Sequence, residues 1–227
     1  MPLTLTVPPA AEPILRDQAK QHCRIDDAHE DRLIDRLITA ARRYAERITG
    51  RAFINQTWQQ SFDRFPPMDR FGPGPGMRRN DFMDGEYGLG RAIMLAKAPL
   101  VSVTSLQYFD DTNTQQTWAS SNYTVDAASV PGILTESYTG VVLNQWPDTF
   151  SVRNAVTVTY VAGYGTSWES VPADLIEAML CLIGHWYINR EEVASEIANF
   201  QAQSVPMMAT MLLEYYRIYD ERIFAFV

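Results

Sequence analysis

The chain has 227 residues, of which 46% are hydrophobic and 20% charged, a balance ordinary for a protein that buries a core. Its net charge of -8, from 27 acidic and 19 basic residues, argues against tight nucleic-acid binding, which requires clustered lysine and arginine. The sequence contains no apolar run of about 18 residues, so it predicts no membrane span. Its two cysteines are too few for a disulfide framework.

Two helices are expected near the start of the chain. Residues 1–10 predict an extended arm, and a short helix is expected after Pro13. Asp27 and Glu30 have the spacing of a capping box, which predicts that a second, longer helix opens there. Gly50 stands where this helix should end, because glycine adopts positive φ without steric cost. The predicted helix has one apolar face, formed by Leu33, Ile34, Leu37, Ile38, Ala41, Tyr44, Ala45 and Ile48.

Four arginines lie away from that apolar face. Arg32 and Arg36 form a like-charge pair four residues apart, and Arg43 and Arg47 form another. Each pair costs roughly 0.2–0.5 kcal/mol unless an acceptor outside the helix satisfies it. An acidic region of a neighbouring subunit is one such acceptor, and simple solvation is the other interpretation.

The pattern becomes that of β-strands after residue 53. Alternating stretches rich in β-branched and aromatic residues predict strands at 57–62, 101–106 and 155–160. Shorter strand candidates lie at 92–95, 123–125, 133–135 and 141–143. The stretch from Pro66 to Gly90 is rich in glycine and proline, so it predicts a loop.

Helical periodicity returns after Gly165 and again after Pro206. We therefore predict an α+β fold, in which a helical core from both ends of the chain is interrupted by an antiparallel β-rich insertion. The predicted divisions are an N-terminal arm with core helices, the insertion, a C-terminal core helix and a C-terminal helix or tail, at residues 1–52, 53–165, 166–204 and 205–227.

The run from His185 to Glu192 looks at first like an active site, because it gathers a histidine, two aromatics, an arginine and two carboxylates. Trp186 and Tyr187, however, continue the apolar stripes of the preceding helix, so we interpret the run as core and helix-end packing. The chain has 3 histidines, and none has the spacing of a zinc motif. We expect no catalytic residue, no metal and no cofactor.

In order along the chain, several motifs resemble those of the head–tail connector (adaptor) family of tailed bacteriophages, prophages and gene transfer agents. They are Pro8 to Pro13, Ala19 to Ile25, Ala40 to Arg51, Gln56 to Trp58, Ala98 to Val103, Tyr160 to Gly165, His185 to Glu191 and Pro206 to Arg217. The sequence departs from the family pattern at Leu15, where a serine or threonine usually caps the first helix.

The resemblance implies a structural virion protein rather than an enzyme. Such adaptors form a ring of about twelve copies beneath the portal, in the neck between capsid and tail, after assembly in the host cytoplasm. Double-stranded DNA passes through the ring without sequence-specific binding, and no membrane is involved. The partners implied are the portal protein, a tail or stopper protein and further copies of the chain.

The resemblance also suggests which residues make contacts. In such adaptors the C-terminal segment engages the portal, so the portal-contact candidates are Tyr215, Tyr216, Arg217, Tyr219, Ile223, Phe224 and Phe226. The subunit-contact candidates are Arg32, Arg36, Arg43, Arg47, Asn189, Arg190 and Glu191. Two alternative functions are a tail-completion or stopper protein of the neck and a neck-associated cell-wall hydrolase using His185 and Glu192.

Overall fold

The computed structural model describes residues 2–66, 92–139, 142–143, 145–189 and 206–219. Two compact units emerge: a helical unit of residues 9–56 and 163–219, and a β-rich unit that includes residues 2–8 and 57–162. The fold is of the predicted α+β class, with four α-helices and antiparallel strand pairs among the described residues. The loop prediction for Pro66 to Gly90 falls, beyond Pro66 itself, outside the described residues.

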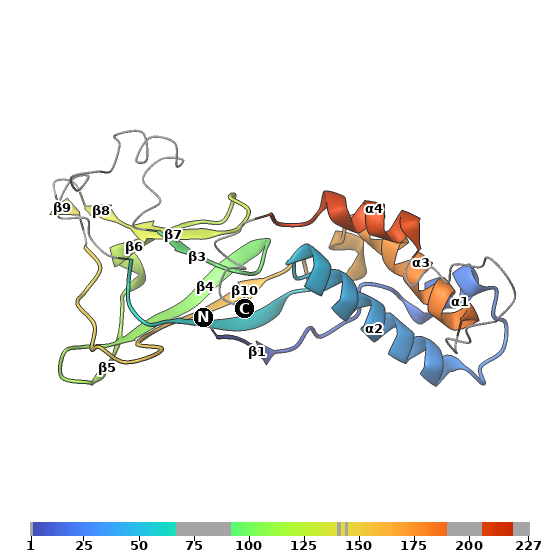
Figure 1. Cartoon of the computed structure of the whole chain (residues 1–227), viewed down its shortest axis with the longest axis horizontal. Coiled ribbons are helices and arrows are strands. Elements are labelled where there is room, and N and C mark those ends of the chain that lie inside the picture. Colours follow the sequence, from blue (N-terminus) through green and yellow to red (C-terminus); the bar gives the residue numbers. More distant parts are fainter. Residues whose placement is uncertain (1, 67–91, 140–141, 144, 190–205, 220–227) are drawn as a thin grey trace, which may run out of the picture. The chain divides into compact units, whose positions relative to one another are not determined.

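The helical unit consists of α1 (Arg16–Cys23), α2 (Asp31–Thr49), α3 (Ala173–Ile188) and α4 (Met207–Tyr215), with a 3₁₀ turn at Trp168–Ser170 (Figure 1). Helix α3 contacts each of the other three helices. One apolar core joins them, and its buried members include Ile34, Ile38, Ala41 and Ala45 of α2, Leu175, Met179 and Leu182 of α3, and Ala209 and Leu213 of α4. The helical periodicity of both chain ends therefore predicted this core correctly.

The start of α2 differs from the expected capping box. The helix begins at Asp31, and its first residue is preceded by Glu30, which makes no side-chain cap hydrogen bond. Asp27 instead accepts a hydrogen bond from the His29 N–H at 3.1 Å. The Glu30 carboxylate accepts one from the Tyr187 hydroxyl of α3. Both side chains are engaged elsewhere, so the capping-box prediction was wrong.

The end of α2 is as predicted, since Gly50 has φ of 73° and terminates the helix in the left-handed region. At the start of α1, Leu15 occupies the cap position without a side-chain cap bond of its own. Only the return half of a capping box is present there, because the Gln18 Oε1 accepts from the Leu15 N–H at 3.0 Å.

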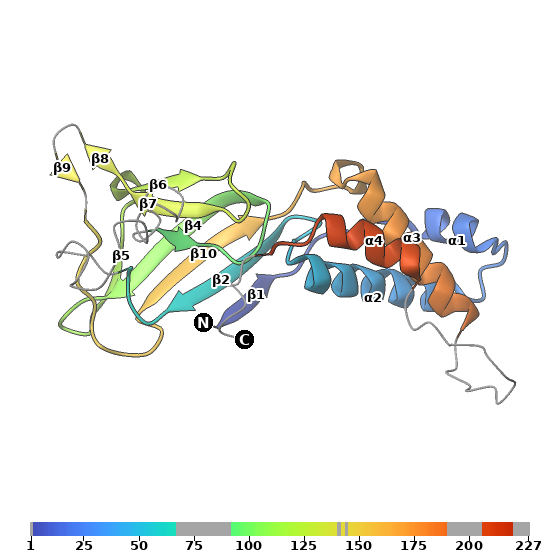
Figure 2. The same cartoon turned by 45° about the horizontal axis from the view of Figure 1, so that its top comes forward.

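The β-rich unit contains a five-stranded sheet, which Figure 2 shows. Its strands lie in the order β1 (Leu3–Val7), β2 (Gln56–Phe62), β10 (Val156–Ala162), β4 (Leu100–Phe109) and β5 (Gln115–Thr117). A second sheet has the order β3 (Ile93–Met94), β7 (Ile133–Glu136) and β6 (Tyr123–Asp126), and β8 (Tyr138–Thr139) pairs with β9 (Val142–Leu143). Most predicted strands are confirmed, with boundaries shifted by a few residues.

Three strands were not predicted: β1, β5 and β8. Residues 3–7, expected as an extended arm, pair antiparallel with β2, with Leu3 opposite Gln60. The alternation in this segment is short and lies next to two prolines, so only its partner strand makes it a sheet element.

A buried polar cluster holds the segment after β3 against the sheet. The Gln60 amide donates to the Met94 carbonyl at 3.2 Å, and its Oε1 accepts from the Ala96 N–H at 2.9 Å. The Lys97 N–H donates to the Tyr160 hydroxyl at 3.2 Å. Burial raises the pKa of Tyr160 far above its usual value, so this hydroxyl stays protonated and remains part of the network.

Candidate interaction surfaces of the helical unit

Two aromatic residues of the run that resembled an active site, Trp186 and Tyr187, pack against the helical core at the end of α3. The Trp186 and Tyr44 rings meet edge to face with centroids 5.8 Å apart, and the Tyr187 hydroxyl donates to Glu30. The Asn189 Nδ2 donates to the His185 carbonyl at 3.0 Å and so satisfies an end of the helix. Trp186 and Tyr187 fix α3 against its neighbours and Asn189 closes the helix end, which agrees with the interpretation as core and helix-end packing.

The described residues contain no group of three or more metal-ligating side chains that could hold an ion. None of the helices the structure describes is long and apolar enough to span a bilayer. The described contact candidates lie on two surfaces of the helical unit.

The first surface is the C-terminal segment, and the structure separates its tyrosines. Tyr215 is 84% exposed and Tyr219 is 70% exposed, whereas Tyr216 packs against the core. The Tyr216 hydroxyl donates to Asp174 at 3.2 Å, and the Arg51 Nε donates to the Tyr216 carbonyl at 2.6 Å. Burial, followed by the hydrogen bond to Asp174, raises the pKa of Tyr216. Tyr216 is thus an anchor of the fold.

Arg51 holds this segment in a second way. Its guanidinium lies 5.8 Å from the centre of the Tyr216 ring and donates to the Tyr164 hydroxyl at 3.3 Å. Burial raises the pKa of Tyr164, although the charge of Arg51 opposes the shift. The Ile218 N–H donates to the Thr49 carbonyl at 3.0 Å. The segment after α4 is therefore attached to the C-terminal end of α2.

Helix α4 carries an exposed apolar stripe, defined here as Met207, Met211 and Tyr215. These residues are four apart, so they lie on one side of the helix, opposite the buried Ala209 and Leu213. Their exposed fractions are 64%, 68% and 84%. An exposed stripe of large apolar side chains at this density is typical of a protein interface.

The remaining portal-contact candidates divide between described and undescribed residues. Arg217 is exposed and pairs with Glu214 at 3.4 Å, and Glu214 also accepts from the Tyr219 hydroxyl. Ile223, Phe224 and Phe226 lie outside the described residues. The stripe of Met207 and Met211 was not anticipated, although their spacing to Tyr215 was visible in the sequence.

The second surface is the outer face of α2. The subunit-contact candidates Arg32, Arg36, Arg43 and Arg47 are all exposed. Asn189 is exposed as well, while Arg190 and Glu191 lie outside the described residues. Their contacts with a neighbouring subunit stay a prediction.

Arg42, which precedes Arg43 in the chain, behaves differently from those four arginines. It is 6% exposed, and its Nε donates to Glu12 at 2.7 Å while its Nη1 donates to Glu46 at 3.1 Å. Burial by itself would lower the pKa of Arg42, but the bond to Glu12 and the charge of Glu46 raise it. The Glu46 carboxylate also accepts from the Phe53 N–H at 2.9 Å. This buried ion network ties the segment before α1 to α2 and to the connection between α2 and β2.

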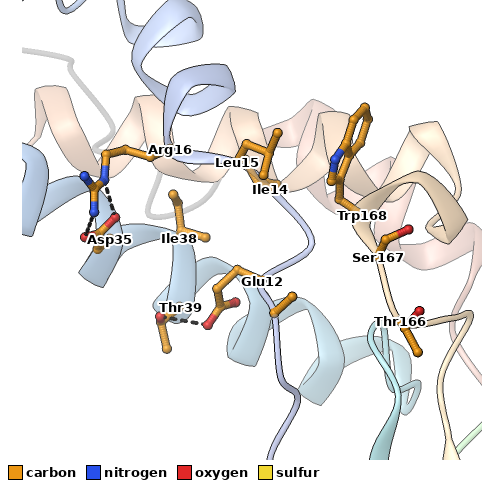
Figure 3. A pocket seen from close by; sticks show the side chains of 11 residues that line it. Glu12, Ile14, Leu15, Arg16, Asp35, Ile38, Thr39, Thr166, Ser167 and Trp168 are labelled. Atoms are coloured by element: carbon orange, nitrogen blue, oxygen red, sulfur yellow. Dashed lines mark hydrogen bonds and ion pairs between the residues drawn. The ribbon is translucent and has the colours of Figure 1, made fainter.

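A groove of about 320 Å³ opens beside this network. Its lining includes Ile14, Leu15, Ile38, Trp168 and the ion pair of Arg16 with Asp35. Figure 3 shows the Arg16–Asp35 pair on one side of the groove and Trp168 on the other. The Arg16 Nη2 lies 2.6 Å from the Asp35 Oδ2, and this bond is the main reason that the pKa of Arg16 is raised. The groove is mostly apolar, and its charged groups already have partners, since Arg16 pairs with Asp35 and Glu12 accepts from Thr39 and Arg42.

Two glycines explain part of the Tyr160 to Gly165 motif. Gly163 has φ of 152°, and a Cβ there would lie 2.5 Å from the Asn55 backbone nitrogen. A Cβ at Gly165 would lie 2.3 Å from the Ser170 Oγ. Close approach of the Asn55 backbone therefore requires glycine at position 163, whereas at position 165 a Cβ would meet the Ser170 side chain. The Asn55 N–H also donates to the Gly165 carbonyl at 2.8 Å.

Comparison with known proteins gives one family. Residues 17–67 match the family described as "Phage gp6-like head-tail connector protein". No curated protein matches the chain.

Solved structures share the fold over 97% of both chains. The chain is similar to one in the "Virion of native gene transfer agent (GTA) particle", with 18% identity and a TM-score of 0.65. It is also similar to chains in the "Neck of empty GTA particle computed with C6 symmetry", with 19% identity and a TM-score of 0.65, and in the "Neck of native GTA particle computed with C12 symmetry", with 22% identity and a TM-score of 0.59. At these identities the likeness establishes the fold.

Proposed function

We propose that this chain, which carries a phage gp6-like head–tail connector domain, is an adaptor in the neck of a phage-like or gene-transfer-agent particle. The domain match over residues 17–67 and the fold shared with chains of such necks support a structural neck role. The adaptor would lie between capsid and tail in the finished particle, after assembly from the host cytoplasm.

The observation that carries the proposal is the apolar stripe of α4. Met207, Met211 and Tyr215 leave a large apolar surface in water, and covering it with a partner removes that surface from solvent. Tyr219 adds a further exposed aromatic ring. We assign this surface to the portal protein. Tyr216 contributes indirectly, by holding the segment after α4 in place.

In this function the chain forms a ring of about twelve copies, a number suggested by the C12 symmetry of one similar neck. The DNA would pass through the ring without sequence-specific contacts. A net charge of -8 suits that role, because a negative surface repels the phosphate backbone and allows the genome to slide.

The test is the double substitution Met211→Ser and Tyr215→Ser, assayed by co-sedimentation with the purified portal of the same particle. We expect portal binding to fall at least tenfold while the helical content is unchanged. The matched control is Leu15→Ser, which also removes a half-exposed apolar side chain of the helical unit. Unchanged portal binding contradicts the assignment. Loss of binding to the tail or stopper protein instead favours a tail-completion or stopper role.

A further inference from the structure

The outer face of α2 holds four arginines that the rest of the described chain leaves without charge partners. At about 100° of rotation per residue, Arg32, Arg36, Arg43 and Arg47 fall within an arc of roughly 60°. That arc lies opposite the buried Ile34, Ala41 and Ala45. The side chains of the four arginines form no ion pair or hydrogen bond with any residue that the structure describes.

Helix α2 itself gives no reason for this arrangement. The four arginines form two like-charge pairs at four-residue spacing, which is unfavourable on an isolated helix. Arg32 also lies in the first turn, where the helix dipole disfavours a cation. Arg42 shows the contrast, because it is held by Glu12 and Glu46. An acidic partner outside the subunit would relieve both unfavourable terms.

The opposite side of the helical unit is acidic. Glu169, Asp174 and Glu177 are exposed in the 3₁₀ turn before α3 and the first turns of α3. On α3, Glu177 lies roughly 160° around the helix from the buried Leu175, whose side joins the core shared with α2. Within the part of the chain that the structure describes, no cation pairs with these three acids.

Two oppositely charged faces on opposite sides of one unit fit a contact between copies. We propose that the α2 arginine face of one subunit binds the acidic α3 turn of the next subunit, with Arg36 and Arg43 opposite Glu169 and Glu177. Such a contact joins unlike faces, so it repeats from copy to copy, and it closes into a ring when the rotation between neighbouring copies divides a full turn. A symmetric pairing of two α2 faces would bring arginines together and is disfavoured. The inference rests on the proposed ring and names the surface that forms it.

Charge exchange tests this contact. Variant A carries Arg36→Glu and Arg43→Glu, and variant B carries Glu169→Arg and Glu177→Arg. Asp174 is left intact because it holds Tyr216. In either variant alone, like charges meet across every contact. In an equal mixture, the introduced glutamates on α2 of A meet the introduced arginines at positions 169 and 177 of B. The native α2 arginines of B meet the native Glu169 and Glu177 of A.

The assay is native mass measurement of rings assembled on the purified portal, with circular dichroism to verify folding. We expect A alone and B alone to lose rings at least tenfold and their mixture to restore alternating rings. A chain carrying all four substitutions should also form rings. The matched control for variant A is Arg64→Glu with Arg153→Glu. It makes the same change in net charge as variant A, at exposed positions of the β-rich unit, and should leave rings intact.

The possible results distinguish a failure of the α2–α3 contact between subunits from a failure of the proposed adaptor role. Intact rings of A and B, or folded variants that fail to rescue each other, overturn the contact but leave the adaptor role standing. Intact rings of A that retain packaged DNA less well would assign the arginine face to DNA and would also overturn it. A wild-type protein that forms no ring on the portal overturns the adaptor role and the contact together.

Discussion

Replacing Arg42 by methionine should be among the most damaging single changes in the helical unit. The guanidinium is 6% exposed and donates to Glu12 through two nitrogens, at 2.7 and 3.2 Å, and to Glu46 at 3.1 Å. Methionine fills a similar volume but provides no charge and no donor. The Glu46 carboxylate, itself 7% exposed, then loses its ion pair with Arg42 inside the protein.

The magnitude follows from the burial of the two carboxylates. Removing one partner of a buried ion pair costs roughly 3–5 kcal/mol, because the other charge is left without compensation. The Glu12 side chain is 33% exposed and can regain water, and Glu46 keeps the hydrogen bonds that it accepts from the Phe53 N–H and the Gln56 amide. We therefore expect the lower end of the range, about 3 kcal/mol of the free energy of unfolding.

Urea unfolding followed by far-ultraviolet circular dichroism measures the change, since the helices dominate that signal. The matched control is Arg43→Met, an exposed neighbour that should stay within about 0.5 kcal/mol of wild type. Adding Glu46→Gln to Arg42→Met should recover about 1 kcal/mol, because it removes the buried charge and keeps an acceptor. Equal effects of Arg42→Met and Arg43→Met would refute the reasoning.

The remaining predictions concern a cap, a glycine and a carboxylate. Leu15→Ser should raise the free energy of unfolding by about 0.5–1 kcal/mol in a thermal melt, because serine can cap α1 where leucine cannot; a loss of stability would contradict this. Gly163→Ala should cost about 2 kcal/mol or more, because a Cβ would strike Asn55 at 2.5 Å and φ is 152°, and an unchanged melting temperature would exclude the proposed close approach. Asp110 should titrate at a pKa of about 2 in an NMR experiment, held there chiefly by the Thr112 hydroxyl, so the stability that it contributes is present above about pH 4 and is lost as the pH falls toward 2. Thr112→Ala should move this pKa upward, and an unmoved titration would contradict the assigned cause.

The sequence predicted those parts of the fold that repeat with a regular period. The core face of α2, its end at Gly50 and the long strands follow from spacing alone, because burial of one face imposes a period of 3.6 or 2 residues. Strand β1 was missed because its five residues, four of them exposed, take their structure from pairing with β2. The prediction for the start of α2 was wrong because Tyr187, far along the chain, binds Glu30.

The candidate surfaces also depend on contacts that only the folded chain makes. Tyr215, Tyr216 and Tyr219 looked equivalent in the sequence, yet the packing of α4 buries part of Tyr216 and exposes the others. The spacing from Ala209 through Leu213 to Tyr216 could have revealed this difference. Arg42 could be distinguished only in part from its neighbour Arg43: its partner Glu46, one helical turn later, is visible in the sequence, whereas its other partner Glu12 lies thirty residues earlier and is brought near only by the fold.

The proposed role as a ring-forming adaptor of a particle neck can be tested by a mass measurement of the purified protein with and without its portal. We expect the portal to recruit about twelve copies into one complex, as the C12 symmetry of a similar neck suggests. A protein that remains a monomer and does not bind assembled portals would contradict it.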